Sequence, residues 1–157
     1  MLKKNISIVI PCFNEENNIK NTYIELNKII NSIKKYQFDL LFIDDGSTDS
    51  TFTNIKKIAK KDRKIKCVKL SRNFGSHISI SAGFEHVKNS HAAILITADL
   101  QEPPEIILKL IEKWESGIEI VWTVRKHRKQ SLLSKTFSKI FYSLFIKYSI
   151  LKKYPKD

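Results

Sequence analysis

The chain has 157 residues, enough for one domain with a hydrophobic core, and its 42% hydrophobic and 28% charged residues are ordinary for a globular protein. No stretch approaches the roughly 18 uninterrupted apolar residues of a membrane span, which excludes a hydrophobic transmembrane helix. The two cysteines, Cys12 and Cys67, match no metal or redox spacing, which favours a reducing compartment.

The net charge of +12 is concentrated toward the end of the chain. Residues 123–157 contain ten Lys and Arg and one acid, so this segment alone contributes +9. A basic cluster indicates an anionic partner, which could be nucleic acid, phospholipid or a phosphate-bearing substrate. A solvated charged surface is the alternative, although it explains dispersed charge better than a cluster.

Hydrophobic periodicity predicts alternating strands and helices along the chain. In chain order these are a strand over 6–10 ended by Pro11, a helix over 19–33, a strand over 38–43, a helix carrying Phe52, Ile55 and Ile58, a strand over 65–70, a helix over 76–87, a strand over 92–96, a helix with Pro104 as its first residue, and a strand over 118–124. This rhythm predicts an α/β fold with a Rossmann-like, mostly parallel sheet and helices on both faces.

Four polar loops follow the first four predicted strands. They span residues 11–15, 44–49, 72–75 and 97–101, and they contain several carboxylates and one arginine. In a parallel sheet all four loops lie at the same edge, where open α/β sheets bind their ligands. The loops therefore predict a site for a metal-bound phosphate compound.

Asp99 and Gln101 are the strongest metal-ligand candidates. They lie two residues apart just after an apolar strand, so in an extended segment both oxygens point to the same side. A carboxylate and an amide oxygen suit a hard cation that accompanies phosphate, Mg²⁺ or Mn²⁺. Since D-x-Q is a weak pattern, Asp99 as a simple turn residue or helix cap remains open.

The usual nucleotide-binding loops do not occur in the chain. No G-x-G-x-x-G follows the first strand, and no G-x-x-x-x-G-K-[ST] is present. With four glycines in total, backbone cradling of phosphate is disfavoured. A divalent metal that neutralises a diphosphate is the alternative device.

Four ordered motifs resemble those of the family 2 glycosyltransferases: IVIPCFNEE (8–16), FIDDGSTD (42–49), LSRNFG (70–75) and ADLQEPPE (98–105). The closest branch resembles the polyprenyl-phosphate glycosyltransferases, relatives of dolichol-phosphate mannose synthase, from about residue 6 to about residue 148. The resemblance implies a GT-A fold and a hexosyltransferase. Such an enzyme moves a sugar from a UDP- or GDP-linked donor to a polyprenyl phosphate lipid, for cell-envelope glycan or glycolipid synthesis.

The resemblance also implies roles for individual residues. The nucleotide-sugar pocket would be formed by Pro11, Phe13, Glu15, Asp44, Asp45, Arg72, Thr97, Asp99 and Gln101. Within that pocket, Asp45, with Asp44 beside it, would hydrogen-bond the base, and Arg72 would lie near the nucleotide or its diphosphate.

The metal and the acceptor have their own implied residues. Asp99 and Gln101 would be the ligands of Mg²⁺ or Mn²⁺, and Arg125 and Arg128 would meet the acceptor phosphate. The residues implied in catalysis are thus Asp99, Arg125 and Arg128.

Two departures from the family pattern stand out. Thr97 occupies the position of the first Asp in D-x-D-x-Q, where a hydroxyl brings no charge. Members of this branch are usually longer, so the chain is interpreted as C-terminally short. An alternative function is therefore a truncated, non-catalytic, membrane-associated nucleotide-binding fragment.

The tail is expected to form a second region. Residues 1–130 are assigned to the catalytic domain and 131–157 to an amphipathic basic helix and tail, whose apolar face carries Leu133, Phe137, Ile140, Leu144, Tyr148 and Leu151. Such a helix is typical of binding to an anionic membrane surface. This predicts a cytoplasmic protein, peripheral on the inner face of the cell membrane.

The tail has two other interpretations. Packing of the helix on the domain core or on a second subunit, in a homo-oligomer, remains open. Nucleic acid is not expected as a partner, because the tail aromatics line an apolar stripe instead of interleaving with basic residues on an exposed face.

Overall fold

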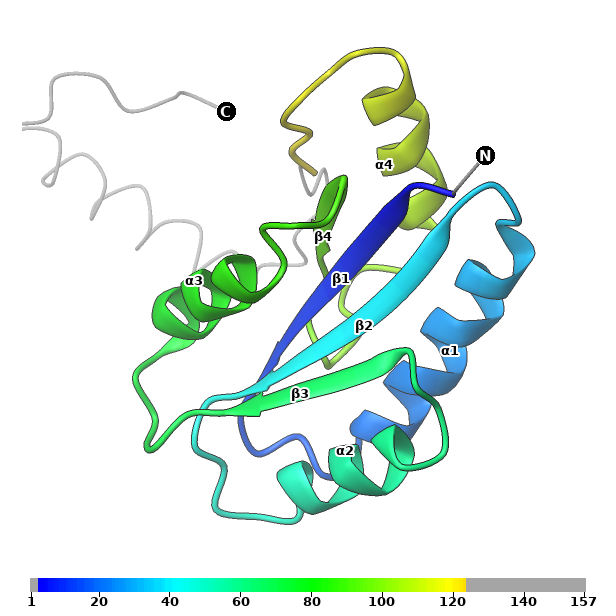
Figure 1. Cartoon of the computed structure of the whole chain (residues 1–157). Coiled ribbons are helices and arrows are strands. Elements are labelled where there is room, and N and C mark those ends of the chain that lie inside the picture. Colours follow the sequence, from blue (N-terminus) through cyan, green and yellow to red (C-terminus); the bar gives the residue numbers. More distant parts are fainter. Residues whose placement is uncertain (1–2, 124–157) are drawn as a thin grey trace, which may run out of the picture. The chain divides into compact units, whose positions relative to one another are not determined.

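The computed structural model of the protein describes residues 3–123, in which strands and helices alternate (Figure 1). The elements are β1 (Asn5–Cys12), α1 (Ile19–Ser32), β2 (Gln37–Asp44), α2 (Thr51–Ala59), β3 (Ile65–Lys69), α3 (Ser76–His86), β4 (Ala92–Leu95) and α4 (Ile106–Glu115). The four strands form one parallel sheet in the order β3-β2-β1-β4. The predicted α/β fold with a parallel sheet is confirmed.

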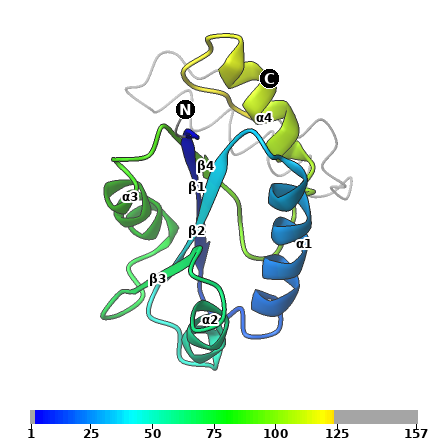
Figure 2. The ribbon, with the colours of Figure 1, turned by 45° about the vertical axis from the view of Figure 1, so that its right-hand side comes forward.

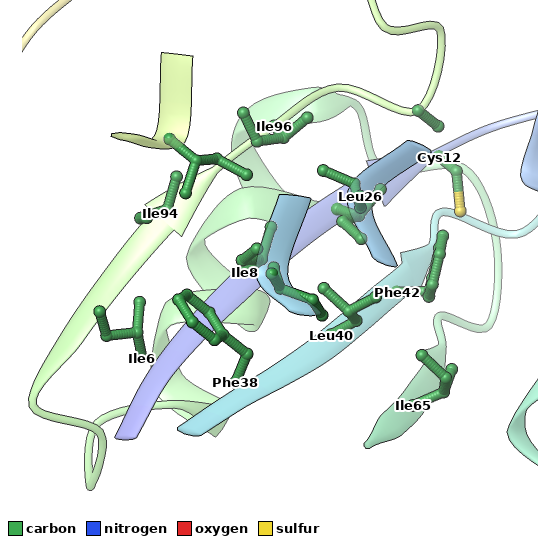
Figure 3. Close-up of a cluster of buried hydrophobic side chains, with 14 of the residues drawn as sticks. Ile6, Ile8, Cys12, Leu26, Phe38, Leu40, Phe42, Ile65, Ile94 and Ile96 are labelled. Carbon is green, nitrogen blue, oxygen red and sulfur yellow. The ribbon is translucent and has the colours of Figure 1, made fainter. Parts of the chain in front are cut away.

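Helices cover both faces of the sheet, as predicted. α3 lies on one face, and α1, α2 and α4 lie on the other (Figure 2). Alternate residues of β1 face the two layers, and both sets are buried: Ile6, Ile8 and Ile10 on the α1 side, Ser7 and Val9 on the α3 side. The larger hydrophobic cluster fills the space between the sheet and α1 (Figure 3).

Pro11 lies inside β1, so the prediction that it ends the strand is wrong. Pro11 pairs in register with Ile43 of β2, and the Cys12 carbonyl accepts a hydrogen bond from the Asp45 N–H at 2.9 Å. Because the backbone groups of successive residues face opposite neighbours, those of Pro11 face β4, as those of Val9 do. Proline has no N–H, so it cannot extend the β1–β4 ladder, which ends with the bond from the Ile96 N–H to the Val9 carbonyl.

The strands β1 and β4 separate at the point where the strand order of the sheet reverses. β1 pairs with β2 on one side and with β4 on the other, so the strand order reverses at β1. In open α/β sheets, such a switch point opens a crevice beyond the carboxyl ends of the strands, where ligands bind. Pro11 therefore ends the ladder at the place where the fold predicts a ligand.

The end of the described region differs from expectation in two places. Residues 118–123, the described part of the predicted strand 118–124, form no strand, and Ile120 is 72% exposed. An apolar alternation becomes a strand only where a neighbour pairs with it, and none of the four strands described pairs with this segment. Helix α4 begins at Ile106 instead of Pro104, because a turn closed by the bond from the Ile106 N–H to the Pro103 carbonyl precedes it.

The eight elements belong to one compact unit that ends at Val121. Arg125, Arg128 and the predicted helix after residue 131 lie outside the described residues. Within residues 3–123, no helix is both long enough and apolar enough to cross a bilayer.

Candidate functional site

The loop after β1 is tied to the loop after β2. The N–H of Asn14 donates to Ser47 Oγ at 2.9 Å, and Asn14 Oδ1 accepts from the Thr48 N–H at 3.0 Å. Asn14 adopts a left-handed conformation with φ of 54°, which asparagine tolerates better than most residues. The Glu15 N–H donates to Thr51 Oγ1 at 2.7 Å. These bonds join two of the predicted loops into one surface.

The predicted base-binding pair, Asp44 and Asp45, is buried. Asp44 has no exposed surface, and its Oδ1 accepts from the Ser47 N–H at 3.1 Å. Its Oδ2 has no hydrogen-bond partner among residues 3–123. The Lys69 ammonium lies 3.6 Å from that second oxygen, just outside hydrogen-bond distance. Asp45 is 3% exposed and points to the loop that follows β3.

The loop after β3 carries Arg72, which is exposed. Its guanidinium lies over the ring of Phe74, with 4.6 Å between the guanidinium carbon and the ring centroid. Asp45 Oδ1 accepts from the Phe74 N–H and Oδ2 from the Gly75 N–H, each at 2.9 Å. The second and third loops are therefore joined through one buried carboxylate.

The loop after β4 gathers oxygen atoms around Asp99. Thr97 Oγ1 lies 2.7 Å from Asp99 Oδ1, and the backbone N–H of Gln101 donates to the same oxygen at 3.2 Å. The side-chain amide of Gln101 donates to Asp99 Oδ2. Thr22 of α1 donates to the Ala98 carbonyl and ties this loop to the helix. The side chains of Thr97, Asp99 and Gln101 are thus in contact. The segment between Asp99 and Gln101 is not extended as predicted, because Leu100 is left-handed with φ of 51° and the chain turns there.

Sequence reasoning missed Glu102. Its Oε2 lies 3.3 Å from Thr97 Oγ1, so the threonine hydroxyl stands between two carboxylates. The turn at Leu100, with φ of 51°, brings residues 101 and 102 back toward Thr97. An acid five residues after Thr97 does not by itself predict this contact, because it depends on that left-handed residue.

The donors around Asp99 suit a hard divalent cation. Within residues 3–123, no group of three or more His, Cys, Asp or Glu side chains is placed to hold a metal. The polar groups present are two carboxylates, a hydroxyl and the Gln101 amide, which can turn either its oxygen or its nitrogen toward a ligand. Mg²⁺ commonly binds through one or two carboxylates and completes its shell with waters and substrate phosphates. The residues present therefore fit a Mg²⁺ or Mn²⁺ ion that is shared with a phosphate ligand.

Burial and neighbouring groups shift the pKa values of Cys12 and Asp49 at this edge. Burial, reinforced by the charges of Asp44, Glu15, Asp49 and Asp45, raises the pKa of the Cys12 thiol far above its ordinary value. Burial also acts to raise the pKa of Asp49, but hydrogen bonds from Thr51 and Glu16 outweigh it and lower that pKa. A bound cation would reduce the repulsion between these carboxylates and a diphosphate.

Three further residues of the predicted pocket lie among the described residues. Pro11 is half-buried at the end of β1, Phe13 is 40% exposed, and Glu15 is half-buried and accepts from the Asn18 amide at 2.6 Å. Their predicted contacts with a nucleotide stay predictions. Arg125 and Arg128 lie outside the described residues.

Residues 7–156 match the family model described as Glycosyl transferase family 2. Undecaprenyl-phosphate 4-deoxy-4-formamido-L-arabinose transferase of Salmonella choleraesuis (strain SC-B67) is 39% identical over 138 residues, which are 87% of this chain and 42% of that protein. The chain spans 42–47% of the length of the first curated relatives it matches.

Two solved structures share the fold. Glucosyl-3-phosphoglycerate synthase from Mycobacterium tuberculosis in complex with uridine diphosphate has a TM-score of 0.59 at 19% identity, over 92% of this chain and 50% of that one. Mannosyltransferase PcManGT from Pyrobaculum calidifontis, in complex with GDP-Man and Mn²⁺, has a TM-score of 0.53 at 16% identity, over 62% of this chain and 28% of that one. The GT-A fold prediction is confirmed.

Proposed function

Because the chain belongs to glycosyl transferase family 2, we propose that it takes part in moving a sugar from a nucleoside-diphosphate donor to a polyprenyl phosphate. The acceptor class is supported by the Salmonella relative, whose name specifies undecaprenyl phosphate. The donor class is supported by the two structures with the same fold, whose descriptions name UDP and GDP-Man. The product would serve cell-envelope glycan or glycolipid synthesis.

The observation that carries the proposal is the cluster of Thr97, Asp99 and Gln101 next to the point where β1 and β4 part. Its oxygens fit Mg²⁺ or Mn²⁺, and the mannosyltransferase with this fold is described with Mn²⁺. When bound, the cation would neutralise the donor diphosphate and stabilise it as a leaving group. Asp99 and Gln101 are the residues that would hold it, and Glu102 would supply the charge that Thr97 lacks.

The remaining residues would bind and orient the reactants. Pro11 and Phe13 border the base-binding pocket, and Arg72 binds diphosphate oxygens with its guanidinium. A lipid phosphate is already anionic near neutral pH, so the reaction needs no strong general base and depends on positioning. Arg125 and Arg128 are assigned to that acceptor phosphate, and the basic segment 131–157 to an anionic membrane surface, which places the protein on the cytoplasmic side of the membrane.

A non-catalytic, nucleotide-binding role is the second candidate. The uncharged Thr97 favours it, because a hydroxyl contributes less than a carboxylate to the binding of a divalent cation. The contact between Thr97 and Glu102 counts against it, because this contact returns a carboxylate to the same place.

Equilibrium binding of UDP and GDP to the full chain, with and without Mn²⁺, tests the donor site. We expect metal-dependent binding of one nucleotide, lost in Asp99→Ala and kept in the control Glu112→Ala on the exposed side of α4. Transfer from the sugar form of that nucleotide to polyprenyl phosphate then tests the acceptor. Binding without transfer would favour the non-catalytic candidate, and no binding in the wild-type chain would overturn both.

A further inference from the structure

We propose that Asp45 is a positioning residue: it holds the loop Arg72–Gly75 so that the Arg72 guanidinium, stacked on Phe74, meets the donor diphosphate. The inference rests on the proposed function and changes the role expected for Asp45. The resemblance assigns this carboxylate to the nucleotide base, whereas its contacts in the structure are with the neighbouring loop.

Both oxygens of Asp45 are used within the protein. Oδ1 accepts from the Phe74 N–H and Oδ2 from the Gly75 N–H, each at 2.9 Å, and the residue is 3% exposed. Hydrogen bonds from backbone N–H groups to a carboxylate are stronger than neutral ones, and burial protects them from water. In the described part of the chain, no other side chain from outside this loop hydrogen-bonds its backbone. Asp45 is therefore the anchor of the loop.

Gly46 fixes the same loop by close contact. A Cβ atom at Gly46 would lie 2.3 Å from the Arg72 carbonyl carbon, 2.6 Å from Arg72 Cα and 2.7 Å from the Asn73 nitrogen. These are backbone atoms, which cannot move aside as a flexible side chain can. Gly46 also has φ of 71°, where glycine is favoured. The two residues that follow β2 thus set the position of the Arg72 backbone.

Phe74 then sets the direction of the Arg72 side chain. The guanidinium lies 4.6 Å from the ring centroid, within the range of a cation–π contact. No carboxylate in residues 3–123 forms a salt bridge with Arg72, so its N–H groups are available to an external anion. A planar guanidinium held at one face by a ring offers its edge to phosphate oxygens.

A chain of contacts therefore runs from Asp45 through the Phe74 backbone to the Phe74 ring and the Arg72 guanidinium. If Asp45 acts through Arg72, replacing either residue removes the same interaction with the diphosphate. If Asp45 instead binds the base, replacing it changes the preference between UDP and GDP, and the loss of binding free energy adds to the loss caused by replacing Arg72. The two roles thus predict different results for the same set of variants.

The test measures Mn²⁺-dependent binding of UDP and GDP to the full chain carrying Asp45→Asn, Arg72→Ala or both. We expect each single variant to weaken binding about tenfold, and the double variant to be no weaker than about the worse single one, because coupled residues are not additive. The ratio of the UDP and GDP affinities should stay at its wild-type value in Asp45→Asn. The matched control is Asp62→Asn, which should bind both nucleotides as the wild type does. Asp62, just before β3, also accepts a backbone N–H, that of Lys64 at 3.0 Å.

A second set of variants keeps the test informative if Asp45→Asn does not fold. Phe74 is 42% exposed, so its replacement leaves the core intact. Phe74→Leu should weaken nucleotide binding by about two- to fivefold, which corresponds to the loss of an exposed cation–π contact. Phe74→Tyr keeps an aromatic ring and should bind as the wild type does. Additive losses in the double variant, a changed base preference, or normal binding by Phe74→Leu would each overturn the inference. Failure of the wild-type chain to bind either nucleotide would overturn the proposed function and the inference with it.

Discussion

The hydroxyl oxygen of Thr97 lies 2.7 Å from the Oδ1 carboxylate oxygen of Asp99. A second carboxylate, that of Glu102, lies 3.3 Å from the same hydroxyl. Thr97 thus puts an uncharged hydroxyl where the family's D-x-D-x-Q pattern has a carboxylate, while Glu102 brings a carboxylate to the same place. Two substitutions in this cluster can establish whether charge or geometry limits its affinity for a cation.

Replacing Thr97 with aspartate should strengthen the binding of Mn²⁺. Three neighbouring carboxylates repel one another, so we expect metal-free Thr97→Asp to lose roughly 1 kcal/mol of unfolding free energy. Added Mn²⁺ should then raise its melting temperature by more than it raises that of the wild type. Thr97→Asn, of similar size and without charge, is the control. An equal Mn²⁺ shift in all three chains would show that Thr97 does not face the cation.

Glu102→Gln should weaken Mn²⁺ binding by about tenfold, a value typical of residues that support a metal ligand. The substitution keeps the size of the side chain and removes its charge. Titration of the chain with Mn²⁺, followed by the electron paramagnetic resonance signal of the free ion, measures the affinity without an assay of transfer. Glu105→Gln, on an exposed residue at the start of α4, should bind as the wild type does. A wild-type affinity in Glu102→Gln would exclude Glu102 from the metal site.

Cys12 should make the stability of the protein fall above pH 9. Burial and nearby acids raise the pKa of its thiol in the folded state above the ordinary value of 9.0. As pH rises, the thiol therefore loses its proton first in the unfolded chain, which then binds fewer protons than the folded chain. The free energy of unfolding falls as a result. The slope reaches at most about 1.4 kcal/mol per pH unit for one group. Urea denaturation between pH 8 and 10.5 should show a smaller loss in Cys12→Ala than in Cys67→Ala, and equal slopes would contradict the prediction.

Gly83→Ala should destabilise the protein, although alanine favours helices. A Cβ atom there would lie 2.3 Å from Val9 Cγ1, and Val9 is fully buried in the sheet. The helix propensity gained is about 1 kcal/mol, whereas overpacking of a core costs about 1 to 3 kcal/mol. We expect a net loss of about 1 kcal/mol by urea denaturation, with Val9→Ala in the same chain recovering part of it. Ser81→Ala, on the exposed side of α3, should change little.

The alternation of apolar runs and amphipathic helices was sufficient to predict most of the fold. It succeeded because parallel strands buried on both faces, such as β1, leave a continuous apolar signal. It failed at Pro11 and at residues 118–123 for one reason: whether a residue belongs to a strand depends on its neighbour in the sheet. Pro11 has a partner in β2, and Ile120 has none among the strands described.

The site was predicted at the level of its loops and less well at the level of its contacts. The parallel sheet places the four loops at one edge. The alternation of predicted strands and helices along the chain was enough to predict this. The contact of Asp45 with Phe74 and Gly75 joins residues about thirty positions apart through backbone N–H groups, which carry no sequence signal. Glu102 contacts Thr97 because Leu100 between them is left-handed. A leucine in the sequence does not predict that conformation.

The central position of β1 bears on the synthesis of the chain. β1 is translated before both of its partners: it pairs with β2 from residue 37 onward and with β4 only from residue 92. At about 5–20 residues per second, roughly 4 to 17 s separate the synthesis of Ile6 from that of its β4 partner Ala92. During that interval one edge of the strand and part of its apolar surface lack their final cover. Before β4 is made, β1 is therefore a segment of the nascent chain through which chaperones can bind or aggregation can begin.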